Sequence, residues 1–142
     1  MSKLLSLLCL TVAIVFTACG QETKIQEGLA LKYLVQMPLT KQLHPPLIVI
    51  LHGYGSDERD MFELAKVLPK SYVIVAARAP LALQGGGYQW FEKEMVNGKF
   101  SGRKESVARS RELVSTFIGQ VAKRYNADAG TVFLMGSARA LS

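Results

Sequence analysis

The sequence has few of the residues that form metal sites and covalent crosslinks. It contains 2 cysteines and 2 histidines in 142 residues. Cys9 and Cys19 both lie near the start, so a disulfide framework and a cysteine-rich metal site are excluded from the rest of the chain. His44 and His52 lack partners at the spacing of metal ligands, and His44 is expected to face solvent in a loop. We therefore expect no metal and no cofactor.

The chain also lacks a concentrated region of positive charge. Its formal net charge is +6, from 17 basic and 11 acidic residues. The basic residues are spread along the chain, and no stripe with interleaved aromatic residues is present. This distribution is typical of a solvated surface, and nucleic acid is not expected as a partner. The length allows one domain.

The N-terminal segment has the pattern of an export signal. Lys3 precedes the apolar run Leu4 to Phe16, which is too short to span a membrane comfortably, and Ala18 is a small residue at a potential cleavage site. We therefore predict a signal peptide over residues 1–18.

Phe16-Thr17-Ala18-Cys19 resembles a bacterial lipobox. The resemblance implies that Cys19 is lipidated and that residues 19–28 form a polar tether from a membrane anchor. Because Gly20 is not acidic, the expected location is the outer membrane, in the periplasm or at the cell surface. Simple secretion with a free Cys19 thiol is the alternative.

A strand, a glycine turn and a helix follow one another from Pro46 to Leu68. The apolar run Leu47 to Leu51 predicts a strand buried on both faces, as in a mostly parallel sheet flanked by helices. His52-Gly53-Tyr54-Gly55 predicts a tight turn, since glycine permits a positive φ and close approach of the backbone. Ser56 is predicted to cap the following helix, and Pro69 marks its end.

The remaining pattern extends this α/β arrangement. We predict strands over 29–37, 72–76 and 131–135, with one face of the first buried more deeply than the other. The segment 93–104 is predicted to be irregular, and residues 107–125 to form an amphipathic helix packed on the core. Gly85, Gly86 and Gly87 are followed by no Lys-Ser/Thr pair, which excludes a phosphate-binding loop.

Three segments of the chain resemble one enzyme family. They are LHGYGSDERDMFELA from Leu51, Arg78-Ala79-Pro80 with Gly86 to Phe91, and Val132 to Gly136. In order and spacing they are similar to the phospholipase/carboxylesterase family of α/β-hydrolases, which includes acyl-protein thioesterases. The resemblance covers Leu29 to Gly136, roughly the N-terminal half of such a fold. Residues 29–142 are therefore expected to form a truncated α/β-hydrolase domain that ends at the nucleophile turn.

The resemblance implies a function for two loops. His52, Gly53, Tyr54 and Gly55 correspond to the oxyanion loop, with the Tyr54 N–H contributing to the oxyanion hole. Tyr88, Trp90 and Phe91 correspond to walls of an acyl pocket, although a surface loop with Trp90 covering the core fits the residues equally well. The implied substrates are acyl esters, thioesters or lysophospholipids.

The nucleophile motif is damaged. The fold needs G-x-S-x-G, with an acid and then a histidine later in the chain. Here the residues are Gly136-Ser137-Ala138-Arg139-Ala140, and no Asp, Glu or His follows. Ser137 is a displaced candidate nucleophile, one residue early. Without a base its hydroxyl stays protonated, so this chain is expected to lack turnover.

A shift of reading frame accounts for the last residues. With synonymous codons chosen to fit, the family-like Gly-Phe-Ser-Gln-Gly-Ala-Ile-Met can be written GGC TTC AGC CAG GGC GCT ATC ATG followed by A, and a frameshift or sequencing error that drops one T gives GGC TCA GCC AGG GCG CTA TCA TGA. This translates as Gly136 to Ser142 and a stop. We therefore expect a frameshifted, inactive esterase. The alternatives are a non-catalytic ligand-binding lipoprotein that uses the loop 85–91, and a gene remnant without function.

Overall fold

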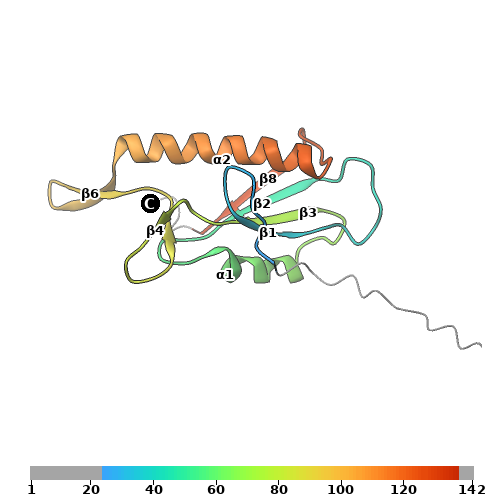
Figure 1. Cartoon of the computed structure of the whole chain (residues 1–142), viewed down its shortest axis with the longest axis horizontal. Helices are drawn as coiled ribbons and strands as arrows, with labels where there is room; N and C mark the ends of the chain where they lie inside the picture. The colour runs from blue at the N-terminus through green and yellow to red at the C-terminus, as the bar shows by residue number, and fades with distance from the viewer. Residues whose placement is uncertain (1–23, 138–142) are drawn as a thin grey trace, which may run out of the picture.

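The computed structural model describes residues 24–137, which form one four-stranded sheet between two helical layers (Figure 1). The signal peptide, Cys19, most of the tether, Ala138 and Ala140 lie outside the described residues. The sheet order is β1-β3-β2-β8. Its strands are β1 (Tyr33–Gln36), β2 (Leu47–Leu51), β3 (Val73–Ala77) and β8 (Val132–Gly136).

The sheet is mostly parallel, as predicted. β2 runs parallel to both β3 and β8, with Val49 opposite Val75 on one side and Leu134 on the other. β1 pairs antiparallel with β3. The connection from β2 to β3 passes through the helices α1 (Glu58–Phe62) and η1 (Glu63–Lys66). The sequence prediction of an α/β fold is therefore confirmed.

Each face of the sheet has its own hydrophobic core, because successive side chains of a strand point to opposite faces. Val49 and Val75 pack with Phe117 and Val121 of α2 (Lys104–Arg124) on one face. Ile48 and Ile50 pack with Phe62 of α1 on the other. Figure 1 shows α2 and α1 on opposite sides of the sheet. β2 and β3 are therefore buried on both faces.

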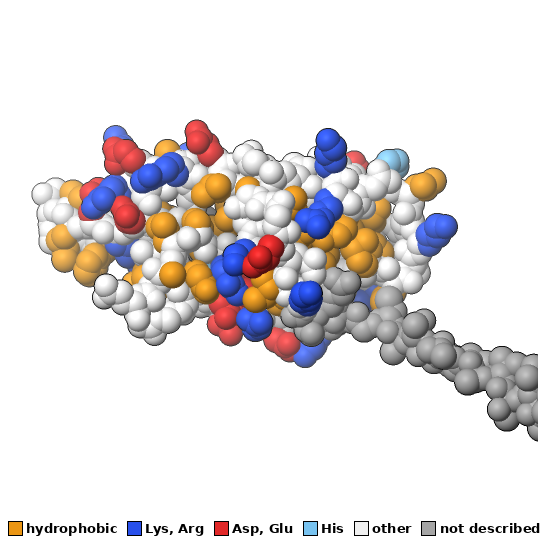
Figure 2. All heavy atoms as spheres, viewed as in Figure 1, with side chains coloured by type: hydrophobic (Ala, Val, Ile, Leu, Met, Phe, Trp, Pro, Cys, Tyr) orange, Lys and Arg blue, Asp and Glu red, His pale blue; other side chains and the backbone are white. Residues whose placement is uncertain are grey.

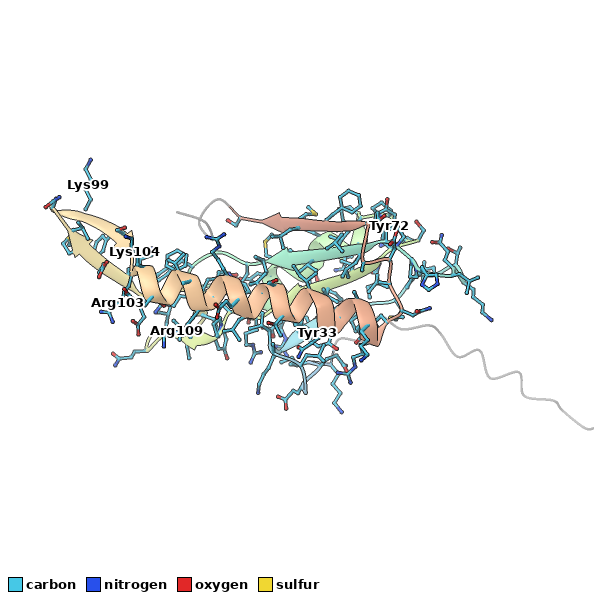
Figure 3. The ribbon with its side chains drawn as sticks, turned by 90° about the horizontal axis from the view of Figure 1, so that it is seen from above. Tyr33, Tyr72, Lys99, Arg103, Lys104 and Arg109 are labelled. Carbon is cyan, nitrogen blue, oxygen red and sulfur yellow. The ribbon has the colours of Figure 1, made fainter. Side chains whose placement is uncertain are left out.

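Tyr33 connects β1 to the end of α2, and Figure 3 shows it beneath that helix. Its ring is fully buried and contacts Phe117 edge-on, with 5.3 Å between ring centroids. Its hydroxyl lies 2.8 Å from the Tyr125 hydroxyl. Residue 33 is thus fixed against the far end of a helix that begins at residue 104.

Helix α1 differs from the prediction at its start. The N-cap is Asp57, whose side chain accepts hydrogen bonds from the N–H groups of Arg59 and Asp60. The predicted cap, Ser56, instead donates its hydroxyl to the Asp60 carboxylate (2.5 Å). Asp57 has extended backbone angles, which suit a cap, whereas Ser56 is paired with a distant loop at Tyr88.

Two other segments differ from the prediction. The first strand is shorter than 29–37, and all four of its residues are buried because a helix covers each face of the sheet. The segment predicted to be irregular forms a hairpin of β6 (Lys93–Val96) and β7 (Lys99–Gly102). A smaller hairpin, β4 (Leu81–Ala82) and β5 (Tyr88–Gln89), lies within the loop before it. No helix within residues 24–137 is long and apolar enough to cross a membrane.

Candidate functional site

The candidate site lies at the carboxyl ends of β2 and β8. Leu51 pairs with Gly136 at the last position of the two parallel strands. The Ser137 N–H donates a hydrogen bond to the Leu51 carbonyl (3.4 Å). Ser137 and the loop that starts at His52 therefore leave the sheet side by side. Ligands of open α/β sheets bind at this kind of edge.

The backbone of the loop after β2 leaves two amide groups available. The Gly55 N–H donates to Tyr88 O (3.0 Å), and the Ser56 N–H donates to Gly53 O (3.2 Å). Within residues 24–137 the Gly53 and Tyr54 N–H groups have no acceptor. One of these two is the amide that sequence reasoning assigned to the oxyanion hole.

His52 is the first residue of this loop, and both of its ring nitrogens are engaged. The side chain is fully buried. Its Nε2 accepts a hydrogen bond from the Ala79 N–H (3.0 Å), so the proton lies on Nδ1, which donates to Gly53 O (2.8 Å). Burial lowers the pKa of His52, and smaller influences of Gly53 O and nearby carboxylates oppose this. The neutral imidazole holds two loops together and has no nitrogen free to act as a base.

This burial predicts a pH dependence of folding. Because the folded pKa of His52 is lowered, the unfolded chain takes up a proton first, at about pH 6.5. Stability should be constant above that pH and fall as the pH drops below it, by up to about 1.4 kcal/mol per pH unit. Urea unfolding between pH 5 and 8 measures this slope.

The control for this pH dependence is His52→Gln. A glutamine oxygen can still accept from the Ala79 N–H, but the side chain does not titrate. The variant should be less stable at pH 8 and lack the decline just below pH 6.5. An unchanged decline in the variant would show that a group other than His52 causes it.

Trp90 and Phe91 line an apolar groove beside the site. The Trp90 indole N–H donates to the His52 carbonyl (2.8 Å), which fixes the ring under the loop. The groove has a volume of about 410 Å³ and runs along α2, beside the end of β2 and the middle of β8. Its other lining residues are Leu51, Val107, Ser110, Arg111, Val114, Ser115, Ile118 and Leu134. Trp90 both fills the core and lines this groove, so the two sequence readings are compatible.

Tyr88, the third predicted pocket residue, lies apart from this groove. Its ring packs beneath the Arg78 guanidinium, 4.7 Å from the centroid, at a different depression that Ala30 and Pro80 also line. Its backbone pairs with Ser56, donating to Ser56 O (2.9 Å). The structure therefore brings together Trp90 and Phe91 but not Tyr88.

The structure explains why position 87, the last of the three adjacent glycines, is glycine. Gly87 has a φ of +74°, and a Cβ at this position would lie 2.2 Å from the Gly55 carbonyl oxygen. The loops around Gly55 and Gly87 thus touch backbone to backbone, which only glycine permits. This contact aligns the two hydrogen bonds that join Tyr88 to Gly55 and Ser56.

Glu58 and Arg78 form a buried ion pair that sequence reasoning missed. Arg78 donates from Nε to Glu58 Oε2 (2.7 Å) and from Nη2 to Oε1 (2.6 Å). Burial opposes ionisation of the fully buried Glu58, but the hydrogen bonds and charge of Arg78 outweigh it, and the pKa of Glu58 is lowered. The only sequence signal was an acidic residue in the first turn of a helix, which usually indicates an exposed position near the helix dipole.

A family model for phospholipase/carboxylesterase proteins matches residues 35–138, most of the chain. The chain belongs to the phospholipase/carboxylesterase family. A search of curated proteins gives no match.

Solved structures show the same fold as this phospholipase/carboxylesterase chain. The carboxylesterase from Mesorhizobium loti is 22% identical with a TM-score of 0.66, over 80% of this chain and 51% of that one. The Bacillus cereus carboxylesterase is 22% identical with a TM-score of 0.62, over 78% and 49%. Esterase PE8 is 24% identical with a TM-score of 0.60, over 79% and 53%. The chain thus spans about half the length of these structures.

The described part of this phospholipase/carboxylesterase chain lacks a base for Ser137. Both nitrogens of His52 are engaged, and His44 lies in the loop before β2, at the opposite end of that strand. Among residues 24–137 no group of three His, Cys, Asp or Glu side chains could hold a metal ion. The site as described offers amide donors, an apolar groove and the Ser137 hydroxyl.

Proposed function

We propose that this chain forms the oxyanion loop, the acyl groove and the nucleophile strand of a serine hydrolase of carboxylic esters, thioesters or lysophospholipids. The observation that carries the proposal is the pair of available amides, Gly53 and Tyr54, next to Ser137 at one edge of the sheet. Two fixed N–H donors stabilise the negative charge that develops on a carbonyl oxygen during acyl transfer. They require no reorganisation, because the Gly55 and Ser56 amides are held by other bonds.

The apolar groove is the second observation in favour of an acyl substrate. Leu51, Trp90 and Phe91 lie at the end nearest the loop, and Val114 and Ile118 continue it along α2. An acyl chain in this groove would place its carbonyl near the oxyanion loop and lose water-exposed apolar surface.

We further propose that the form with Gly136-Ser137-Ala138-Arg139-Ala140 at the nucleophile turn is inactive, through the loss of one base after the Gly136 codon. In this form Ser137 has no base within the described residues, so its hydroxyl remains a weak nucleophile. Synonymous codons of the family motif can be chosen so that the loss of one T gives Gly136 to Ser142 and a stop, which agrees with this explanation.

The test is to restore one T in the codon that follows Gly136 and to compare the two chains. The 142-residue chain should hydrolyse p-nitrophenyl butyrate at the background rate. The restored chain, read on in its new frame, should be an esterase that a fluorophosphonate labels on serine. Sequencing past the stop codon in all frames should reveal an Asp and then a His.

Two outcomes contradict the proposal in different ways. Hydrolysis by the 142-residue chain that is lost in Ser137→Ala would show that it is active as it stands. A restored chain that binds a fluorescent acyl ester in the groove without turnover would instead favour the non-catalytic ligand-binding lipoprotein.

A further inference from the structure

A hairpin projects from the domain at the start of α2 (Figure 1). It consists of β6 and β7, which pair along their full length from Lys93–Gly102 to Val96–Lys99. Asn97 and Gly98 form its two-residue turn with φ values of 49° and 74°. Positive φ at both turn positions is the geometry that joins two strands with the native twist, and Asn-Gly is its preferred sequence. The hairpin is a regular element rather than a disordered excursion.

The tip of this hairpin exposes large apolar side chains. Met95 and Phe100 are direct cross-strand partners and are 60% and 74% exposed, and Val96 on the opposite face is 46% exposed. Figure 2 shows apolar side chains gathered at this end of the molecule. Water-exposed side chains of this size at a projecting tip are typical of an interaction site.

Charged side chains of both signs lie around the apolar tip: the four basic residues Lys93, Lys99, Arg103 and Lys104, and the three acidic residues Glu92, Glu94 and Glu105. Lys99 and Lys104 have no acidic partner among residues 24–137, whereas Arg103 is paired with Glu92 (2.8 Å) and Glu94 (3.8 Å). Figure 3 shows Lys99, Arg103 and Lys104 at the same end of the molecule. At the base of the hairpin, the Lys93 ammonium lies 4.1 Å from the centre of the Tyr54 ring.

We propose that the hairpin Lys93–Gly102 docks onto the surface of a bilayer that contains anionic phospholipids. Phe100, Met95 and Val96 enter the boundary between headgroups and acyl chains, and Lys99 and Lys104 lie near lipid phosphates. Apolar side chains with flanking lysines are complementary to this boundary. A narrow convex tip offers too little area for a stable protein interface, which needs about 800 Å² per partner.

The hairpin is joined to the candidate site at its base. Gly102 packs against Phe91, where an added Cβ would lie 3.0 Å from the ring, and Lys93 covers Tyr54. Docking would thus hold the groove and the oxyanion loop close to the lipid surface. The proposal concerns membrane binding and does not rest on catalysis, so its test is independent of the test of the proposed function.

The test is co-sedimentation of the full chain with vesicles of phosphatidylcholine, with and without about one third phosphatidylserine. Met95→Ser/Phe100→Ser removes the apolar contact, and Val67→Ser, at an exposed apolar position beyond η1, is its matched control. Lys99→Gln/Lys104→Gln removes the cations, and Lys41→Gln is its control. Every variant carries the same N-terminal apolar run, so the comparison is made at lipid concentrations at which about half of the parent chain is bound.

The apolar double variant should lose about tenfold in partitioning. The lysine variant should lose about fivefold for each cation removed, on anionic vesicles only. The controls should bind as the parent does. Equal binding by both double variants and the parent would overturn the proposal, and so would binding lost with the lysines but untouched by the apolar change.

Tryptophan fluorescence provides a second test that does not depend on the folding of the serine and lysine variants. Phe100→Trp should show a blue shift of its emission on anionic vesicles, over the constant background of the buried Trp90. Val67→Trp should show none. An unshifted Trp at position 100 in the presence of saturating vesicles would contradict insertion of the tip.

Discussion

Replacing Arg78 by methionine is expected to lower the free energy of unfolding by about 3–5 kcal/mol. The Glu58 carboxylate is fully buried and receives two hydrogen bonds from Arg78. Methionine fills a similar volume but leaves that charge without its main partner in a site that water does not reach. Urea unfolding followed by Trp90 fluorescence measures the loss.

The double variant Glu58→Gln/Arg78→Met separates the unpaired charge from lost packing. It should recover much of the stability, because a neutral amide costs less to bury than a carboxylate. Arg59→Met is the matched control, since Arg59 is more than half exposed and lies 3.4 Å from Glu58. It should cost less than about 1 kcal/mol. Equal losses of stability in the Arg59 and Arg78 variants would show that the buried Glu58–Arg78 pair contributes no more than the exposed Arg59 contact.

The effect of Arg78→Met should also depend on pH. In the parent chain the pKa of Glu58 is lowered, so its stabilisation is present above about pH 4.5 and is lost as the pH falls through the folded value. Without Arg78, burial is the largest remaining influence and raises that pKa, against the smaller opposing effects of a backbone N–H and of Arg59, so the carboxyl destabilises the fold increasingly above about pH 4.5. The difference between the two proteins should therefore shrink toward pH 4.

Gly87→Ala should separate the two loops that build the candidate site. The added methyl group would lie 2.2 Å from the Gly55 carbonyl oxygen, and the atoms involved are backbone that cannot swing aside. The left-handed conformation costs about 1–2 kcal/mol for a residue with a Cβ, and the overlap adds to this. The hydrogen bonds of Tyr88 with Gly55 and Ser56 should break.

Gly86→Ala is the control for the loop variant. Gly86 also has a positive φ, of 95°, but nothing lies within 4 Å of its Cβ position. It should show the conformational cost alone. Hydrogen exchange of the Gly55 and Tyr88 amides should increase in Gly87→Ala and change little in Gly86→Ala. If both variants behave alike, the close contact of the two loops is not required.

The central sheet could be predicted from sequence because its signal is local. Leu47 to Leu51 is a continuous run of apolar residues that only a strand buried on both faces accommodates in this context, and both faces are buried. The apolar positions of α2 recur at helical spacing, and Phe117 and Val121 are fully buried. Where the apolar pattern of a segment fits only one type of element, that pattern is sufficient to predict the element.

The projecting hairpin was missed because its sequence lacks the apolar pattern of a buried strand. Its strands, KEMV and KFSG, contain no continuous apolar run and no alternation of apolar with polar residues, and Met95, Val96 and Phe100 face water. The Asn97-Gly98 pair was the available signal, since it favours a two-residue hairpin turn regardless of burial. The burial of Glu58 was missed because it depends on the guanidinium of Arg78, twenty positions later in the chain.

The candidate site could be predicted only as far as its backbone. The Gly53 and Gly55 turn and its approach to Ser137 follow from the strand order. The bonds of His52 to Ala79 and of Trp90 to His52 join residues far apart in sequence, and no local pattern encodes them. The role of Tyr88 differs for the same reason, because Arg78 covers its ring.

The pairing of β2 with β8 has a kinetic consequence. β2 and β3 are joined through one short helical connection, but β2 must wait for β8, which follows after α2 and both small hairpins. Closing so long a loop costs entropy before any contact is gained, and such non-local pairings slow folding. The strand that carries Ser137 is therefore expected to dock late, so that the two halves of the candidate site meet near the end of the folding reaction.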